Sequence, residues 1–576
     1  MPDTRIKRAL IAVFDKTGIA DFARTLVSEF GIEIISTGGT ARHLKDAGIP
    51  VTMVEQVTGF PEMLDGRVKT LHPKIHAAIL ADRDKPEHMR QLREHQIEPI
   101  DMVVVSLYPF EETIAKPDCT LEQAIEMIDI GGPCMLRAAA KNYKHVVVVP
   151  SRSDHDLVLA DLRRYGDVRL ARRRELAART FIQTSLYDSN VSLYLMKASL
   201  PGDLMADEEH RSGEVWFGEE SDFVSIDIKR HTICSYGENP HQKAAVFVSQ
   251  DGAGRECSPL PLSESDGTPV RDPVIAGRMS FNNYVDADAA LALVKELTRA
   301  KFAMYAVAFI KHTNACGCAI GDDPIDTYRR AYLGDPIAAA GGVLCMNFPV
   351  TKQIAETVMT SFAQWGKAAG AAFFKLDVWI APSFDPDAVT LITTPTEKRK
   401  WGASCRLLAV GPMDAPPDPN ELDYKKITGG MLVQARDLVG LNEDQWKVVS
   451  KRAPLKSEMS DLRFAWLVCK HTKSNAITIC RDGTLLGSGA GQMSRVKSCD
   501  LAIQLARENG HGDKLRGAVA AGDAFFPVED GPRKLIEAGI TAMIHPGGSN
   551  RDADSIAVCE AAGAAMIMTG TRHFKH

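Results

Sequence analysis

A lysine–histidine–threonine tripeptide occurs twice in this chain, each time after an apolar run. Lys311–Thr313, with the basic pair Lys311 and His312, follows residues 306–310, and Lys470–Thr472 follows residues 464–469. Apolar runs of this length predict buried strands. An imidazole with a pKa of about 6.5 beside a lysine with a pKa of about 10.4 can combine a general base with a fixed positive charge. An exposed basic pair is more often a solvated edge, but the repetition favours a site and predicts two homologous lobes.

A second site is predicted at a turn between a strand and a helix near the N-terminus. Gly38 and Gly39 lie between Thr37 and Thr40, where free backbone N–H groups and the helix end favour an anion. Such a turn alone is more often structural. Cations at the carboxyl edge of the same sheet would make it a site for a phosphorylated small molecule. The cations expected there are Lys16, Arg67 and Lys69.

Three further residues could perform acid–base chemistry near that turn. Tyr108 follows another predicted strand, and Asp129 precedes a helix that runs to Lys141. Together they would offer one site an acid, a base and a polarising cation. Asp129 could equally be a plain helix cap, which is the commoner role.

The elements that must position these residues alternate in the first 150 residues. Short apolar segments predict strands, amphipathic segments between them predict helices, and this alternation is typical of βαβ units around a mainly parallel sheet. A longer helical segment covers residues 169–195. The predicted strands are residues 10–14, 32–35, 102–107 and 146–149, and the clearest predicted helices are residues 40–47 and 121–128.

A change in composition predicts the domain boundary. Between Asp203 and Asp222 there are eight acidic residues and one arginine, which is typical of a solvated linker. We therefore expect a first domain at 1–200 with its core at 1–150, a linker at 201–223, and a second α/β domain at 224–576.

The overall composition excludes several classes of protein. With 45% hydrophobic residues, 25% charged residues and a net charge of −6, the chain is an ordinary globular protein with no general reason to bind nucleic acid. No apolar run approaches the length of a membrane span. Twelve cysteines without a repeated spacing indicate neither a disulfide framework nor a zinc ribbon. We expect a cytoplasmic protein with reduced thiols and no catalytic metal.

Motifs along the whole chain resemble those of one family, the bifunctional AICAR transformylase/IMP cyclohydrolases. The resemblance implies a methylglyoxal-synthase-like cyclohydrolase domain followed by a transformylase made of two cytidine-deaminase-like lobes without zinc. It also implies a homodimer with transformylase sites at the subunit interface. The motifs lie at residues 58–63, 66–73, 128–132, 138–142, 236–242, 311–312, 489–495, 522–527 and 572–574.

The resemblance implies two consecutive reactions. A formyl group passes from 10-formyltetrahydrofolate to AICAR, and the product FAICAR closes to IMP with loss of water. His312 would be the base of the transfer, and Lys311 would stabilise the oxyanion. Lys69, Tyr108, Asp129 and Lys141 would serve ring closure. The other residues implied to bind substrate are Thr70, Tyr236, Asn283, Gly341, Asp377, Asn475, Arg495, Phe525, Ser549 and Arg572. No tightly bound cofactor is expected, and a monovalent-cation site is left open.

Several positions depart from the family pattern. Ala12 and Phe14 would weaken the phosphate site, and Ser235 replaces an arginine. Ala340 and Val528 replace two aromatic residues, so we expect weaker binding of the folate, which restored phenylalanines would reverse. Two other functions therefore stay open: a transformylase with an inactive first domain, and one whose first domain senses nucleotides.

Overall fold

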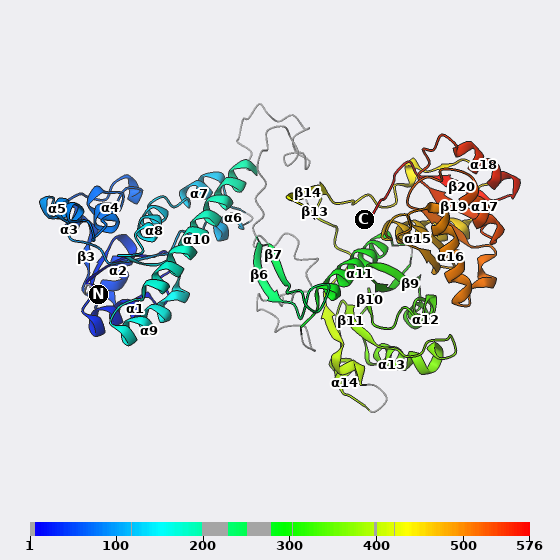
Figure 1. Ribbon diagram of the computed structural model, residues 1–576, viewed down its shortest axis with the longest axis horizontal. Helices are drawn as coiled ribbons and strands as arrows, with labels where there is room; N and C mark the ends of the chain where they lie inside the picture. Colours follow the sequence, from blue (N-terminus) through cyan, green and yellow to red (C-terminus); the bar gives the residue numbers. More distant parts are fainter. Residues whose placement is uncertain are drawn as a thin grey trace. The chain divides into compact units, whose positions relative to one another are not determined.

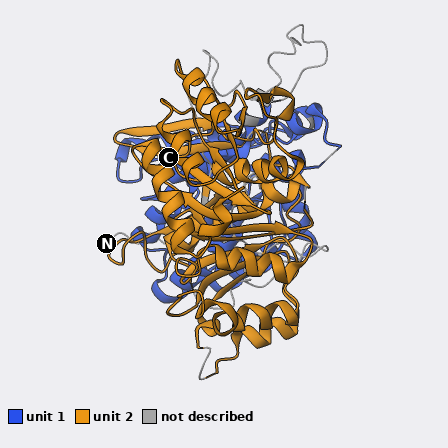
Figure 2. Cartoon of the chain, turned by 90° about the vertical axis from the view of Figure 1, so that its right-hand side faces the viewer, with its two compact units in different colours: residues 1–208 blue, residues 209–576 orange. Residues whose placement is uncertain are grey.

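The chain folds into two compact units in the computed structural model, residues 1–208 and residues 209–576 (Figures 1 and 2). The structure describes residues 6–116, 118–197, 228–249, 278–301, 303–396, 400–419 and 421–576. The predicted linker at 201–223 lies outside the described residues. Within the described residues, no helix is long and apolar enough to cross a membrane.

Unit 1 is built on a five-stranded sheet in which every neighbouring pair is parallel. Its order is β3-β2-β1-β4-β5, and the interior strands are buried apolar segments. The prediction of a parallel α/β sheet is confirmed. The strands are β1 (Arg8–Ala12), β2 (Glu33–Ser36), β3 (Thr52–Met53), β4 (Met102–Val105) and β5 (Val147–Val149).

Ten helices are described in unit 1, and two of them frame the site considered below. Helix α2 (Gly38–Asp46) starts at the end of β2, and α8 (Gly131–Lys141) packs against the long helix α10 (Leu170–Lys197). The others are α1 (Ile19–Phe30), α3 (Val54–Thr58), α4 (Pro73–Leu80), α5 (Pro86–Glu94), α6 (Phe110–Ile114), α7 (Leu121–Glu126) and α9 (His155–Tyr165).

Unit 2 contains a mixed sheet of eleven strands in the order β12-β11-β10-β8-β9-β17-β16-β18-β19-β20-β15. Two separate hairpins, β6–β7 and β13–β14, belong to the same unit. The strands are β6 (Ile228–Ile233), β7 (Ala245–Ser249), β8 (Tyr305–Lys311), β9 (Asn314–Gly321), β10 (Gly342–Met346), β11 (Leu376–Ala381), β12 (Arg406–Ala409), β13 (Leu422–Ile427), β14 (Gly430–Ala435), β15 (Lys447–Val448), β16 (Ile477–Arg481), β17 (Thr484–Gly489), β18 (Val519–Gly522), β19 (Ala542–His545) and β20 (Ala565–Met568).

The large sheet is two copies of one arrangement, which we call lobe 1 (residues 281–409) and lobe 2 (residues 456–568). Each lobe has a helix, an antiparallel hairpin, and then three helix–strand units that extend the sheet outward. The copies meet where β9 pairs with β17. The helices of lobe 1 are α11 (Phe281–Ala300), α12 (Pro324–Gly334), α13 (Lys352–Ser361) and α14 (Pro386–Thr393); those of lobe 2 are α15 (Lys456–Lys470), α16 (Arg495–Glu508), α17 (Asp530–Glu537) and α18 (Asp552–Ala561).

The repeated tripeptide does not mark this duplication. Residues 306–310 lie in β8 as predicted, but residues 464–469 lie in helix α15, so the prediction of a second strand was wrong. All six of those residues are buried. A short apolar run that is buried on every side cannot be assigned to helix or strand from periodicity. Lys470 therefore ends a helix, whereas Lys311 ends a strand.

Candidate functional site

The predicted anion site lies at the N-terminus of α2. Thr37 is the N-terminal cap residue, and its buried hydroxyl has no hydrogen-bond partner among the described residues. Gly38 has a φ of 51°, which favours glycine. A Cβ at Gly38 would lie 3.5 Å from Nζ of Lys69. The structure thus brings a cation and an unused donor to the free N–H groups of a helix end.

Lys16 and Thr40 lie at the same edge of the sheet. Nζ of Lys16 donates to the carbonyl oxygen of Phe14 at 2.8 Å, and the Thr40 hydroxyl donates to that of Val13 at 2.9 Å. Burial lowers the pKa of Lys16; Asp15 raises it and the charge of Lys69 lowers it further. Arg67 is not part of this group, because its guanidinium pairs with Glu126 on an exposed surface.

Asp129 lies just before α8, close enough to Lys69 and Tyr108 for both to affect its pKa. Its Oδ1 accepts a hydrogen bond from N–H of Gly132 at 2.8 Å, so it does cap the helix. Burial raises the pKa of Asp129, while the N–H groups of Gly132 and Tyr108 and the charge of Lys69 oppose that shift. A raised pKa makes it easier for a carboxyl to hold and then release a proton, which is what proton transfer requires.

Two further side chains support this part of unit 1. The Thr70 hydroxyl lies 3.0 Å from the position of a Cβ on Gly131, which places it at the start of α8. Tyr187 of α10 accepts from N–H of Asp129 at 2.7 Å and donates to the carbonyl of Met127 at 2.9 Å. Sequence reasoning missed Tyr187, because nothing near it in the chain indicates that contact.

Lys141 does not join Asp129 within one chain. It is the last residue of α8, and at about 1.5 Å per residue the far end of this helix is roughly 15 Å from its start. Asp129 lines a cavity of ≈ 630 Å³ with Ile130 and Leu195. Lys141 lines another of ≈ 860 Å³ with Arg137.

In unit 2, Lys311 and His312 lie at the turn between β8 and β9. Nζ of Lys311 donates to the carbonyl oxygen of Ala340 at 2.9 Å. His312 is exposed. Oδ1 of Asn314 accepts from N–H of Lys473 at 2.9 Å. That contact joins the turn of lobe 1 to the segment of lobe 2 that leads to Asn475.

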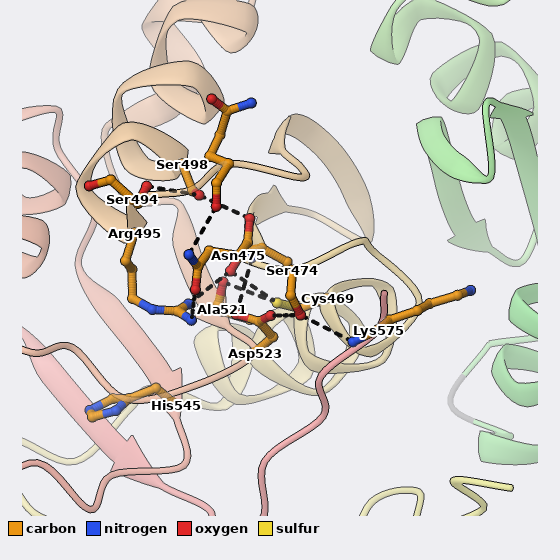
Figure 3. Close-up of polar contacts among 12 residues, drawn as sticks. Cys469, Ser474, Asn475, Ser494, Arg495, Ser498, Ala521, Asp523, His545 and Lys575 are labelled. Carbon is orange, nitrogen blue, oxygen red and sulfur yellow. Dashed lines mark hydrogen bonds and ion pairs between the residues drawn. The ribbon is translucent and has the colours of Figure 1, made fainter. Parts of the chain in front are cut away.

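Asn475 is held by a buried ion pair (Figure 3). Nη2 of Arg495 donates to Oδ1 of Asn475 at 2.8 Å, and Nη1 lies 2.6 Å from Oδ1 of Asp523. The Ser498 hydroxyl donates to the carbonyl of Asn475 at 2.9 Å. The amide of Asn475 is therefore fixed, although Asp523 was not among the predicted site residues.

The C-terminal tail is docked beside this cluster. N–H of Ser474 donates to the carbonyl of Lys575 at 2.9 Å, and N–H of His573 donates to the carbonyl of Asp523 at 3.1 Å. The Arg572 guanidinium lies 4.2 Å from the centre of the Phe574 ring. These contacts bring Arg572 into the same region of lobe 2.

The remaining predicted residues form local groups in unit 2. Tyr236 and Asn283 both bond to residues at the start of α11: the carbonyl of Tyr236 accepts from N–H of Phe281 at 3.0 Å, and Oδ1 of Asn283 accepts from N–H of the cap residue Ser280 at 3.1 Å. N–H of Gly341 donates to the carbonyl of Lys375 at 2.9 Å, and Nζ of Lys375 lies 3.2 Å from Asp377. The Ser549 hydroxyl donates to the carbonyl of Pro527 at 3.3 Å, two residues beyond Phe525, which is exposed.

Among the described residues, Asp82, Asp84 and His145 form one group that could offer three ligands to a metal ion. Lys144 pairs with Asp84, and Nε2 of His145 lies 3.0 Å from Asp82. Lys144 and His145 thus already pair with the two carboxylates of this group. Burial raises the pKa of the Cys316 thiol to about 12 and that of Cys318 as well, so these thiols stay protonated.

Comparisons with known proteins agree with the motifs. The profile "AICARFT/IMPCHase bienzyme" matches residues 139–505, and "MGS-like domain" matches residues 18–134. A "Bifunctional purine biosynthesis protein PurH" from Bacillus mycoides (strain KBAB4) is 42% identical over 99% of this chain and 100% of its own. One from Thermoanaerobacter sp. (strain X514) is 43% identical over the same shares. A solved chain titled "Crystal structure of ForH" is 35% identical, covers 32% of this chain and 97% of its own, and has a TM-score of 0.29.

Proposed function

The chain belongs to the AICARFT/IMPCHase bienzyme family, and from this we propose which residues carry each of its two reactions. It is a bifunctional AICAR transformylase and IMP cyclohydrolase of de novo purine biosynthesis. We assign formyl transfer to unit 2 and ring closure to unit 1, and we place both in the cytoplasm. Unit 2 would be the transformylase of two cytidine-deaminase-like lobes, in keeping with its repeated strand order.

For formyl transfer, 10-formyltetrahydrofolate is the proposed donor. The amine of AICAR attacks the formyl carbon, His312 takes the amine proton, and the C–N10 bond of the tetrahedral adduct breaks as N10 is protonated with the assistance of Lys311. Lys311 lies beside His312 and would stabilise the oxyanion of the tetrahedral adduct. The observation that carries this assignment is the bond between Asn314 and Lys473, which brings the His312 turn to the segment holding Asn475.

For ring closure, Lys16 and the N-terminus of α2 would bind the phosphate of FAICAR, and Lys69 would polarise its formyl carbonyl. Asp129, whose pKa is raised by burial, would exchange a proton with the closing ring, and Tyr108 would assist. A domain that only sensed nucleotides would have no use for Asp129 and Tyr108 beside Lys69. This grouping favours an active cyclohydrolase over the two other functions that the sequence left open.

We further propose that the enzyme is a homodimer and that Lys141 acts in the ring-closing site of the partner subunit. The length of α8 separates Lys141 from Asp129 in one chain. Exposed apolar side chains lie at α8 and on α10, which packs against it: Ile130, just before α8, is 57% exposed, and Ile182 of α10 is 61% exposed. Such side chains are typical of a protein interface.

The cheapest test supplies purified protein with FAICAR and no folate. Formation of IMP supports an active unit 1, and its absence while AICAR is still formylated would leave a transformylase alone. His312→Ala then tests the assignment in unit 2, because it should lower formyl transfer by about 10²–10⁴-fold and leave ring closure intact.

A further inference from the structure

We infer that Asp286 is a positioning residue for His312, a role that rests on the proposed function of His312 as the base of formyl transfer. Asp286 lies in α11, near neither Lys311 nor His312 in sequence. Its carboxylate accepts from N–H of Thr313 at 2.7 Å and from N–H of His312 at 3.3 Å. One side chain therefore holds both residues of the turn between β8 and β9.

The turn needs such support because its backbone is strained. His312 has a φ of 52° and Thr313 a φ of 64°. Lys311 pairs with Asn314 across the hairpin, so His312 and Thr313 form the whole loop. Two consecutive positive φ values are typical of type I′ hairpin turns, which favour Asn-Gly or Asp-Gly. A β-branched threonine with positive φ is a marked outlier.

Lobe 2 contains an equivalent loop, held in the same way, whose residues tolerate the positive φ values better. The loop between β16 and β17 is Asp482-Gly483, with φ values of 51° and 63°. Asp461 of α15 accepts from N–H of Asp482 at 2.9 Å and from N–H of Gly483 at 2.8 Å. The geometry is the same, but the residues of the lobe 2 loop are those that the turn prefers.

The difference between the lobes points to function. Lobe 1 keeps a histidine and a threonine where an aspartate and a glycine would cost less, and strain of this kind collects at functional sites. Asn314 fixes the other side of the turn: Nδ2 donates to the carbonyl of His312 at 2.9 Å, and Oδ1 accepts from Lys473. Asp286 and Asn314 together set the position of His312 relative to lobe 2.

Replacing Asp286 tests this role. We expect Asp286→Ala to lower kcat of formyl transfer about 100-fold, because a shift of roughly 1 Å in a catalytic group costs that much. KM for AICAR should change less than about threefold, and ring closure of supplied FAICAR should be unchanged. If Asp286→Ala does not fold, Asp286→Asn keeps the volume and one accepting oxygen, and a loss of about tenfold is expected.

Second-site rescue separates positioning from general stability. Thr313→Gly makes the lobe 1 loop easier to form, so Asp286→Ala with Thr313→Gly should recover at least about tenfold in kcat over Asp286→Ala. Asp461→Ala is the matched control: it should lower the unfolding temperature but keep kcat within about twofold.

The outcomes are distinguishable. An unchanged kcat in Asp286→Ala, no recovery in the double variant, or an equal loss in Asp461→Ala would overturn the inference. If His312→Ala retains formyl transfer, the proposed role of His312 fails, and the inference fails with it. If His312→Ala is inactive while Asp286→Ala is fully active, only the inference fails.

Discussion

Arg495 and Asp523 form an ion pair of 2.6 Å in which the side chains are only 6% and 0% exposed. The second nitrogen of the same guanidinium holds Asn475. A pair this deeply buried stabilises a structure only while both members are present, because one member alone leaves an uncompensated charge. It therefore couples the stability of lobe 2 to the position of a proposed substrate-binding amide.

Arg495→Met is expected to destabilise unit 2 by about 3–5 kcal/mol, the usual cost of an orphaned buried charge. Denaturant unfolding followed by tryptophan fluorescence measures it. Arg551→Met removes a member of an exposed pair, Arg551–Asp554, and should cost no more than about 1 kcal/mol. Similar losses in both variants would contradict a special role for the buried pair.

His312→Ala should lower formyl transfer by about 10²–10⁴-fold, the usual contribution of a general base. Ring closure of supplied FAICAR should remain near wild type, because we assign it to unit 1. Both rates can be followed by absorbance on one preparation. A comparable loss of both activities in a folded variant would refute two separate sites.

Lys69→Ala, Asp129→Ala and Lys141→Ala should each abolish ring closure and leave formyl transfer measurable, so that FAICAR accumulates. If Lys141 acts in the partner's site, co-expressed Asp129→Ala and Lys141→Ala chains form mixed dimers with one intact site. Random pairing then restores about a quarter of wild-type activity. Asp129→Ala with Lys69→Ala is the control that should restore none, and equal results for the two mixtures would show that Lys141 acts within its own chain.

Ala340→Phe is expected to impair formyl transfer rather than improve folate binding. Ala340 is only 7% exposed, and its carbonyl accepts from Lys311, so a larger side chain would overpack at a cost of about 1–3 kcal/mol. Val528 is only partly buried, and Val528→Phe should be tolerated and lower KM for the folate. Folate titrations of the two variants decide between overpacking and an open pocket.

Acid should destabilise unit 2 through His545. Burial, helped by the charge of Arg495, lowers the pKa of His545 to about 3. The unfolded chain therefore binds the proton more readily, and stability falls as the pH drops below about 6.5, by about 2 kcal/mol at pH 5. In His545→Asn an oxygen can replace Nδ1 as the acceptor for Gly547, and the loss between pH 7.5 and 5 should shrink. An unchanged loss would contradict this assignment.

The parallel sheet of unit 1 could be predicted because its strands are rich in β-branched apolar residues, such as Val103–Val105 in β4. Strand β3 was missed because two residues carry no pattern. The duplication in unit 2 was inferred from the wrong signal, since residues 464–469 are helical. The actual repeat lies in the order of elements, which a single tripeptide cannot report.

The site residues, too, could be predicted only in part. Lys311, His312, Lys69 and Asp129 could be selected because their residue types and neighbours suggest chemistry. Their partners could not be selected, because those contacts join distant parts of the chain. Asp286 reaches a turn 26 residues away, and Tyr187 reaches Asp129 across 58 residues.

The meeting of β9 and β17 has a consequence for how the protein is made. Strand β9 is an edge of the lobe 1 sheet until β17 pairs with it. Unpaired edge strands attract other strands. A ribosome adding about 5–20 residues per second needs roughly ten to thirty seconds to proceed from Gly321 to Gly489. During that interval the nascent chain presents an unprotected strand. The join between the lobes is therefore one place where the nascent chain is exposed to aggregation during synthesis.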